Sequence, residues 1–118
     1  MTKPIRLLAW LLGTLPVVAA AMHPEGTPVT KIPFASQISG WHALDKNRLI
    51  LSLTHSRNYL VTLRQACHPL GFAAHVGVST SNDTIYAGFD YITADGQRCP
   101  IERINEITAE QKKSLVRA

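Results

Sequence analysis

The chain has 118 residues, of which 46% are hydrophobic and 17% are charged, and it contains two cysteines. A chain of this length is expected to form one domain, because a second would be too small to bury a core of its own. The hydrophobic content excludes a wholly disordered chain. The formal net charge of +4 would suit a protein that binds polyanions.

The first 21 residues have the organisation of a secretory signal peptide. Lys3 and Arg6 form a short basic start, residues 7–18 are uncharged, and residues 19–21 are alanines, which suit a cleavage site. The apolar stretch is too short to cross the hydrocarbon core of a bilayer. The sequence therefore predicts cleavage before Met22 and export to the periplasm or beyond, with no permanent membrane span. An uncleaved N-terminal anchor is the alternative.

Loss of the signal peptide would remove much of the positive charge. Residues 1–21 contain Lys3 and Arg6 but no acid, so the mature chain would keep ten basic and eight acidic residues, a net charge of +2. Its basic residues form no stripe, and the adjacent pair Lys112 and Lys113 is interpreted as the solvated face of a terminal helix. We therefore expect no nucleic-acid partner.

Both cysteines, Cys67 and Cys99, lie in the predicted mature chain. In an oxidising compartment an even pair of cysteines favours a disulfide. The alternative is a reactive Cys67 assisted by His68. However, adjacent residues in a strand point to opposite faces, so their adjacency does not indicate a nucleophile and its base.

The mature chain begins with an irregular segment and continues with β-prone runs. Residues 22–37 contain three prolines and predict an extended leader that is mobile or lies across the domain. A hairpin is expected around residues 45–47, with Asn47 at positive φ. The following strand would place Leu49, Leu51 and Leu53 on one face.

Further short strands and turns are expected downstream. Residues 59–64 predict a strand with Tyr59, Val61 and Leu63 on one side. An irregular turn or a single helical turn is expected at residues 67–72. Strands are then predicted at residues 76–80 and 84–94, joined through residues 81–83. Residues 82–84 match a minimal glycosylation triplet but are interpreted as a turn.

The sequence Asp95-Gly96 is the strongest hairpin signal in the chain. Aspartate followed by glycine tolerates the positive φ values of a two-residue type I′ turn. Such a turn would pair Ile92 with Cys99 and Tyr91 with Pro100. Because proline donates no ladder hydrogen bond, Pro100 is expected at a strand edge or a bulge.

Residues 108–111 fit a helix-capping box, and a short helix is expected over residues 109–116. It would persist only by packing Leu115 or Val116 on the domain. The predicted fold is mainly β: a small antiparallel barrel or sandwich with one disulfide and a short C-terminal helix. An α+β arrangement is the alternative. The predicted divisions are a signal peptide at 1–21, a leader at 22–37, a β domain at 38–107, and a helix or tail at 108–118.

The order of several short motifs resembles a family of small exported proteobacterial proteins that is catalogued only as a domain of unknown function. The resemblance covers about residues 36–107 and rests on the motifs Trp41-His42-Ala43-Leu44-Asp45, Tyr59-Leu60, Cys67, Phe89-Asp90 and Asp95-Gly96-Gln97-Arg98-Cys99-Pro100-Ile101. Members often carry a basic residue where this chain has Pro100. The resemblance implies export and paired cysteines, and it implies no activity.

Five histidines invite a metal-site interpretation, but their spacing does not favour one. The gaps between them are too wide to place two on one element, as zinc and copper sites usually do. Convergence of His55, His68 and His75 is the weak candidate for a metal site. We expect no cofactor, and isolated histidines are the favoured interpretation.

Asp90 is the polar residue of greatest interest, because a carboxylate in a mostly apolar strand needs a partner. Arg98, Arg103 or backbone amides are the candidates. No Gly-x-Ser-x-Gly elbow, Ser-x-x-Lys motif or phosphate-binding glycine loop is present, so we assign no catalytic residue. Most aromatic residues are expected in the core, with Tyr86 and Trp41 as a partly exposed pair.

The sequence therefore predicts an exported, non-enzymatic binding or envelope-associated module whose partner is a protein, a glycan or a small ligand. A periplasmic metal-binding protein is the alternative, and a small enzyme that uses Asp90 or a histidine is the least favoured hypothesis.

Overall fold

The computed structural model describes residues 25–117. The predicted signal peptide and the cleavage site before Met22 lie outside the described residues, as does His23. The described strands are β1 (Thr27–Val29), β2 (Lys31–Pro33), β3 (Ile38–Asp45), β4 (Arg48–Leu53), β5 (Arg57–Leu63), β6 (Val76–Val78), β7 (Thr84–Tyr86), β8 (Tyr91–Ala94) and β9 (Gln97–Ile107). The 3-10 helices are η3 (Ala35–Gln37), η4 (Thr54–Ser56) and η5 (His68–Phe72), and the α-helix is α3 (Ala109–Arg117).

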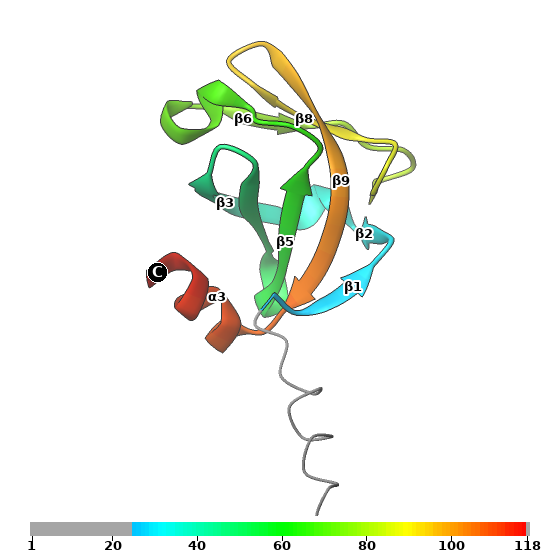
Figure 1. Cartoon of the computed structure of the whole chain (residues 1–118). Coiled ribbons are helices and arrows are strands. Elements are labelled where there is room, and N and C mark those ends of the chain that lie inside the picture. The colour runs from blue at the N-terminus through cyan, green and yellow to red at the C-terminus, as the bar shows by residue number, and fades with distance from the viewer. Residues whose placement is uncertain (1–24, 118) are drawn as a thin grey trace, which may run out of the picture.

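The strands form a nearly closed antiparallel barrel with α3 on its outside (Figure 1). The main sheet has the order β3-β4-β5-β9-β8-β6, and β1 pairs with the C-terminal part of β9. A separate two-stranded ribbon joins β2 to β7. The prediction of a mainly β fold with a short C-terminal helix is confirmed.

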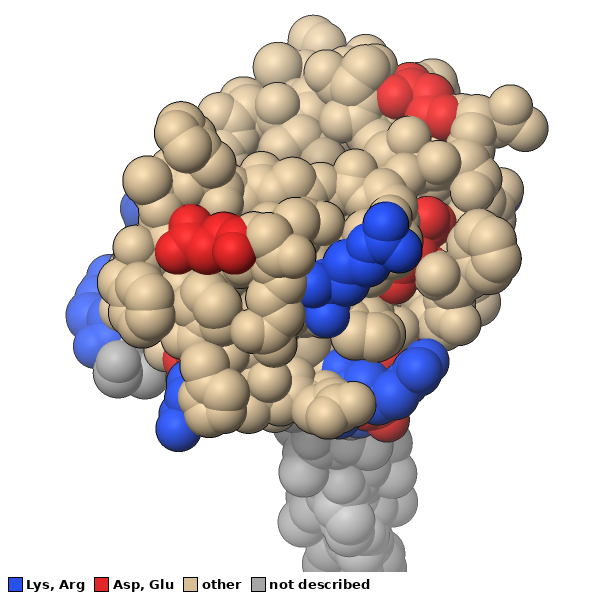
Figure 2. Space-filling view, turned by 90° about the horizontal axis from the view of Figure 1, so that it is seen from above, with Lys and Arg blue, Asp and Glu red and all other residues tan. Residues whose placement is uncertain are grey.

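Charged side chains contribute little to holding this barrel together. On the face seen in Figure 2, basic and acidic residues are scattered among many uncharged ones. The ion pair between Arg57 and Glu106, 3.9 Å apart, joins side chains that are each 44% exposed. Such exposed pairs contribute at most about 1 kcal/mol, so the stability of the fold must come from its apolar interior.

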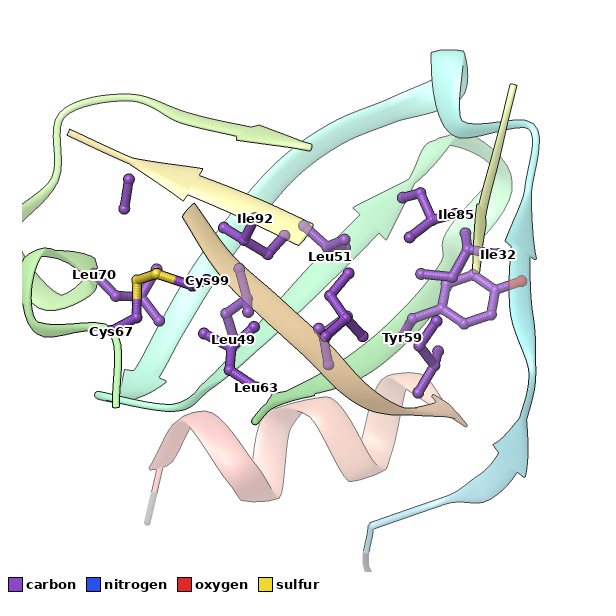
Figure 3. Packing of buried hydrophobic residues seen from close by; sticks show 14 of the residues in the cluster. Ile32, Leu49, Leu51, Tyr59, Leu63, Cys67, Leu70, Ile85, Ile92 and Cys99 are labelled. Atoms are coloured by element: carbon purple, nitrogen blue, oxygen red, sulfur yellow. A yellow bond between two sulfur atoms is a disulfide. The ribbon is translucent and has the colours of Figure 1, made fainter. Parts of the chain in front are cut away.

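The barrel interior is filled by alternate residues of its strands (Figure 3). Side chains of a strand point alternately to opposite faces, which brings Leu49, Leu51 and Leu53 together with Tyr59, Val61 and Leu63, as predicted. Strand β9 adds Ile101 and Ile104, which share this face although they are three residues apart. A register shift between β5 and β9 at this point inserts the extra residue that resets the alternation.

Strands β4 and β5 are also covered on their outer face. Ile50 and Leu60 are fully buried there beside Ile107, and Leu115 of α3 packs against them. The predicted capping box starts this helix: the Thr108 amide donates to Gln111 Oε1 at 2.8 Å, and the Gln111 amide donates to Thr108 Oγ1 at 3.1 Å. The helix therefore begins where predicted and docks through Leu115, whereas Val116 remains 39% exposed.

The described part of the expected leader, residues 25–37, contributes two strands. Strand β1 pairs with β9, and β2 pairs with β7. Ile32 in β2 is completely buried in the core cluster together with Ile85 in β7. Of the two predicted alternatives, a mobile segment and one that lies across the domain, the second is confirmed. The segment contributes buried side chains to the core as well as backbone pairing.

Two of the predicted turns have the left-handed backbone that is typical of tight turns. Asp95 and Gly96 have φ values of 49° and 85°, and the hairpin pairs Ile92 with Cys99 and Tyr91 with Pro100, as predicted. Asn82 and Asp83 have φ values of 53° and 59° and close the predicted turn between Ser81 and Thr84. Pro100 lies beside the register shift of β9, as its missing donor requires.

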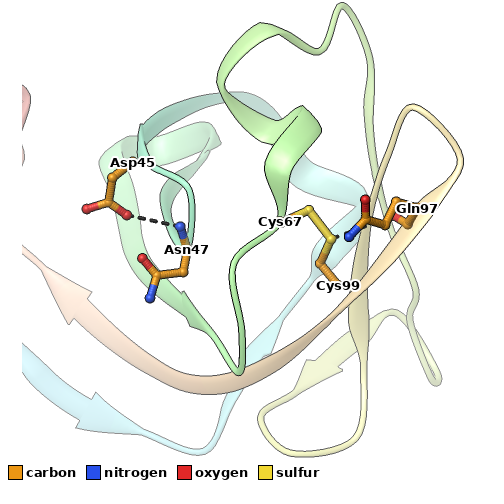
Figure 4. Close-up of a disulfide and its surroundings, with 5 residues drawn as sticks. All are labelled: Asp45, Asn47, Cys67, Gln97 and Cys99. Atoms are coloured by element: carbon orange, nitrogen blue, oxygen red, sulfur yellow. Dashed lines mark hydrogen bonds between the residues drawn. A yellow bond between two sulfur atoms is a disulfide. The ribbon is translucent and has the colours of Figure 1, made fainter.

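The turn between β3 and β4 differs from the prediction, because Asn47 does not have a positive φ. Its amide instead donates to Asp45 Oδ1 at 3.0 Å (Figure 4). Arg48 Nε donates to Asp45 Oδ2 at 2.9 Å. Burial alone would raise the pKa of Asp45, but these hydrogen bonds and the Arg48 charge outweigh it and leave that pKa below its ordinary value.

The bounds of the strands between residues 76 and 94 also differ from the prediction. The expected strand at 84–94 is interrupted, giving β7 and β8, and the expected strand at 76–80 shortens to β6. Strand β6 pairs with β8 rather than with β7, which pairs with β2. The interruption occurs where Gly88 has a φ of 82°, and there the chain leaves the ribbon to enter the main sheet.

We predict that Gly96→Ala lowers the free energy of unfolding by about 1–2 kcal/mol, because a Cβ disfavours the left-handed backbone. No atom lies within 4 Å of the added Cβ, so the cost is one of backbone conformation alone. Gly71→Ala is the matched control, since it also meets no atom within 4 Å and has no positive φ. The control should be neutral or slightly stabilising. If urea denaturation showed the same loss in the free energy of unfolding for both variants, this explanation would be contradicted.

Candidate functional site

The predicted pair of cysteines forms a disulfide inside the core. Cys67 follows β5 and Cys99 lies in β9, with their Cα atoms 5.8 Å apart (Figure 4). Both cysteines are buried, Cys67 completely. Cys67 is thus neither a free thiol nor accessible to a substrate, which argues against a reactive cysteine. Closing a loop of this length stabilises the fold by roughly 3–4 kcal/mol.

The candidate histidines do not come together as a metal site. His55 lies in η4, His68 begins η5, and His75 precedes β6, and all three are exposed. Among residues 25–117, no three His, Cys, Asp or Glu side chains are grouped closely enough to hold a metal ion. The convergence considered for His55, His68 and His75 is therefore absent from the described part of the chain.

Asp90 is buried, with only 3% exposure, and it holds two segments of backbone in place. Its Oδ1 accepts a hydrogen bond from Ser79 Oγ at 2.7 Å, and its Oδ2 accepts one from the Tyr86 amide at 2.7 Å. Ser79 Oγ in turn accepts a hydrogen bond from the Tyr91 amide at 2.9 Å. The expectation of a backbone-amide partner is confirmed.

The two arginines considered as partners of Asp90 lie elsewhere. The guanidinium of Arg98 stacks over the Tyr91 ring, 4.9 Å from its centroid. Arg103 instead pairs with Glu102 at 3.7 Å. The side chain of Asp90 is therefore held by hydrogen bonds rather than by an arginine, and both its oxygens are engaged within the fold.

The expectation that most aromatic residues lie in the core is wrong. Tyr59 is buried and Trp41 packs against the core cluster, but Phe72 is 77% and Phe89 is 73% exposed. Tyr86 is partly exposed, at 38%, as expected. The interior is already filled by the leucine and isoleucine residues of β4, β5 and β9, so aromatic side chains in the turns remain outside.

A groove of the described surface lies between α3 and the barrel wall. Its volume is about 660 Å³, within the range of small-molecule sites. One side is the exposed face of α3, and the other is formed by the ends of β4 and β5 with η4. It is lined by Ser52, Leu53, Ser56, Asn58, Ala109, Lys112, Lys113, Val116 and Arg117.

The charge of the groove has one sign. Lys112, Lys113 and Arg117 line it, and none of its described lining residues carries a carboxylate. Lys112 is tied to the barrel, because its Nζ donates to Ser52 Oγ at 2.9 Å. Ser52 Oγ then donates to Oδ1 of the buried Asn58 at 2.7 Å. A polar chain thus fixes one cation of the groove in position.

The interpretation of Lys112 and Lys113 as only a solvated helix face missed this groove. The available signal was their spacing with Val116 and Arg117, which places all four on adjoining positions of a helix surface. What that surface faces depends on how α3 docks, and docking depends on contacts between residues distant in the sequence. The sequence pattern alone therefore indicates a cationic helix face but not a groove.

Comparison with known proteins identifies a family but no activity. The model of a family of unknown function, DUF6491, matches residues 1–118, so the chain belongs to that family. No curated protein and no solved structure matches the chain. None of the helices in residues 25–117 is long and apolar enough to cross a membrane.

We predict that Asp90→Asn lowers the free energy of unfolding by about 1–3 kcal/mol. An amide offers one acceptor oxygen in place of two, so either the Ser79 hydroxyl or the Tyr86 amide loses its partner. Asp95→Asn is the matched control, because Asp95 is exposed and asparagine also adopts the left-handed turn. The control should change stability by less than about 0.5 kcal/mol. A fully stable Asp90→Asn protein in chemical denaturation would refute this role.

Proposed function

We propose that this member of a family of unknown function is an exported binding or envelope-associated protein, active in the periplasm or outside the cell. In this proposal, its partner is a protein, a glycan or a small ligand. The observation that carries the proposal is the solvent-open cationic groove between α3 and the barrel, on a domain closed by a buried disulfide.

The disulfide and the first 21 residues together support export. Stable disulfides belong to oxidising compartments such as the periplasm. The basic start, uncharged stretch and alanine triplet of residues 1–21 are typical of a signal peptide. These two features are independent, since one depends on Cys67 and Cys99 and the other on the chain start.

The surroundings of the polar side chains favour binding over catalysis. Both carboxylate oxygens of Asp90 accept hydrogen bonds that hold the fold, and general acid–base chemistry needs a carboxyl group that can reach its substrate. The exposed histidines of the described chain are dispersed, which gives no support to the metal-binding alternative. The groove, in contrast, combines cations, hydroxyl groups and aliphatic side chains on one open surface.

Export is tested by the intact mass of the protein recovered from the periplasmic fraction of a Gram-negative host, before and after reduction. We expect the mass of residues 22–118 less two hydrogens, and alkylation of two cysteines only after reduction. The variant Cys99→Ser is the control: because Cys67 is buried, its single thiol should be alkylated without reduction once the protein is denatured. A mass that includes residues 1–21, or two free thiols in the native protein, would contradict the proposal.

Binding through the groove is tested by a photo-cross-linking amino acid placed in intact cells. A probe at Ser56, an exposed residue that lines the groove, should form an adduct after irradiation. A probe at Arg64, which is exposed and outside the groove, is the matched control and should not form that adduct. No adduct at Ser56, or the same adducts at both positions, would overturn the groove as the binding site.

A further inference from the structure

The cations of the groove are arranged in a way that a bound anion would stabilise. Lys113 and Arg117 are four residues apart in α3, and like charges at this spacing on a helix repel each other. Lys112 adds a third charge to the same lining. Neither Lys113 nor Arg117 forms an ion pair with any residue in the described range 25–117. Their charges are therefore available to a ligand.

Hydrogen-bond donors accompany these charges. An ammonium group has three donors, and Lys112 uses one of them on Ser52 Oγ. This contact holds Lys112 against the barrel, so part of the entropy of fixing a long side chain is lost on folding rather than on binding. Arg117 adds a planar guanidinium, which suits the oxygens of phosphate and carboxylate groups.

The remaining wall of the groove is aliphatic. Leu53 comes from the end of β4, while Ala109 and Val116 come from α3. Val116 is 39% exposed beside the cations, although Leu115 next to it packs on the barrel. A purely polar anion would leave these side chains without a contact, whereas a ligand with an apolar portion would bury them.

On the basis of the binding function proposed above, we infer that the groove binds a lipid with an anionic head group. The phosphate of the head group would lie against Lys113 and Arg117, with Lys112 beside it. The first part of the acyl chain would lie along Leu53, Ala109 and Val116. Charge complementarity selects the head group, and the aliphatic wall distinguishes a lipid from a free phosphate ion.

The test is a calorimetric titration of the purified, oxidised protein with three probes. These are dihexanoyl phosphatidylglycerol below its micelle concentration, dihexanoyl phosphatidylcholine, and inorganic phosphate. We expect saturable binding of the anionic lipid, and added salt should weaken it. The other two probes should bind roughly tenfold more weakly, because phosphatidylcholine lacks the net negative charge and phosphate lacks the acyl chains. No binding of the anionic lipid below millimolar concentration, or equally tight binding of phosphate, would overturn the inference.

The double variant Lys113→Gln, Arg117→Gln should bind the anionic lipid roughly tenfold or more weakly than the unmodified protein. The matched control is Lys46→Gln with Arg64→Gln, which removes the same two charges from exposed positions outside the groove. Equal weakening by both pairs would reduce the effect to net charge and refute the site. Val116→Ser should weaken lipid binding roughly threefold without changing phosphate binding. An unchanged affinity for the lipid would refute the aliphatic contact.

This outcome is separable from that of the general binding proposal. If the groove probe at Ser56 captures a protein while the anionic lipid fails to bind, the groove remains a binding site and the lipid assignment falls. If the intact mass shows that residues 1–21 are retained, the proposal of an exported binding protein is contradicted, whatever the result of the lipid titration.

Discussion

The burial of β4 and β5 on both faces is the constraint on which the other features depend. Their inward residues, such as Leu51 and Val61, fill the barrel, but Ile50 and Leu60 on the outer face are equally excluded from water. Leaving two such side chains exposed would cost about 1.5–3 kcal/mol each. Helix α3 supplies the cover through Leu115, so the barrel needs its C-terminal helix in place.

The same constraint creates the groove. Because Leu115 faces the barrel, Lys112 and Val116 lie beside the contact, and Lys113 and Arg117 lie further round the helix. A short helix resting on a curved sheet touches it along one line, and the space beside that line is open to solvent. The cations that line this space come from the same helix that completes the fold. Stability and the candidate site thus share one element.

The features that were predictable from sequence are those decided within a few residues. Asp95 and Gly96 determine their own turn and therefore the register of eight residues, down to the pairing of Tyr91 with Pro100. Thr108 and Gln111 determine where α3 begins. Asn47 shows the limit of this reasoning: Asp45 accepts hydrogen bonds from its amide and from Arg48, and the turn closes without a left-handed residue.

Pairings between distant segments were beyond local patterns. The ribbon of β2 with β7 joins residues more than fifty positions apart, and nothing near Ile32 or Ile85 indicates the other. The disulfide was predictable because two cysteines in an oxidising compartment have a single partner each. Among the partners of Asp90 only the backbone amide was predictable, and only by chemical type. The hydrogen bond from the Ser79 hydroxyl was not, because it depends on how β6 and β8 pair.

The disulfide and the groove lie at opposite ends of β5, so each acts on a different part of the fold. Asn58 near the start of β5 belongs to the groove, and Cys67 follows the end of β5. Strand β9 runs antiparallel beside it, from Cys99 to Ile107, and leads directly into α3. The disulfide therefore fixes one end of the β5–β9 pair, while Ile107 and Leu115 fix the other under the helix. A ligand in the groove would act on the position of α3 without straining the disulfide, because the whole length of both strands lies between them.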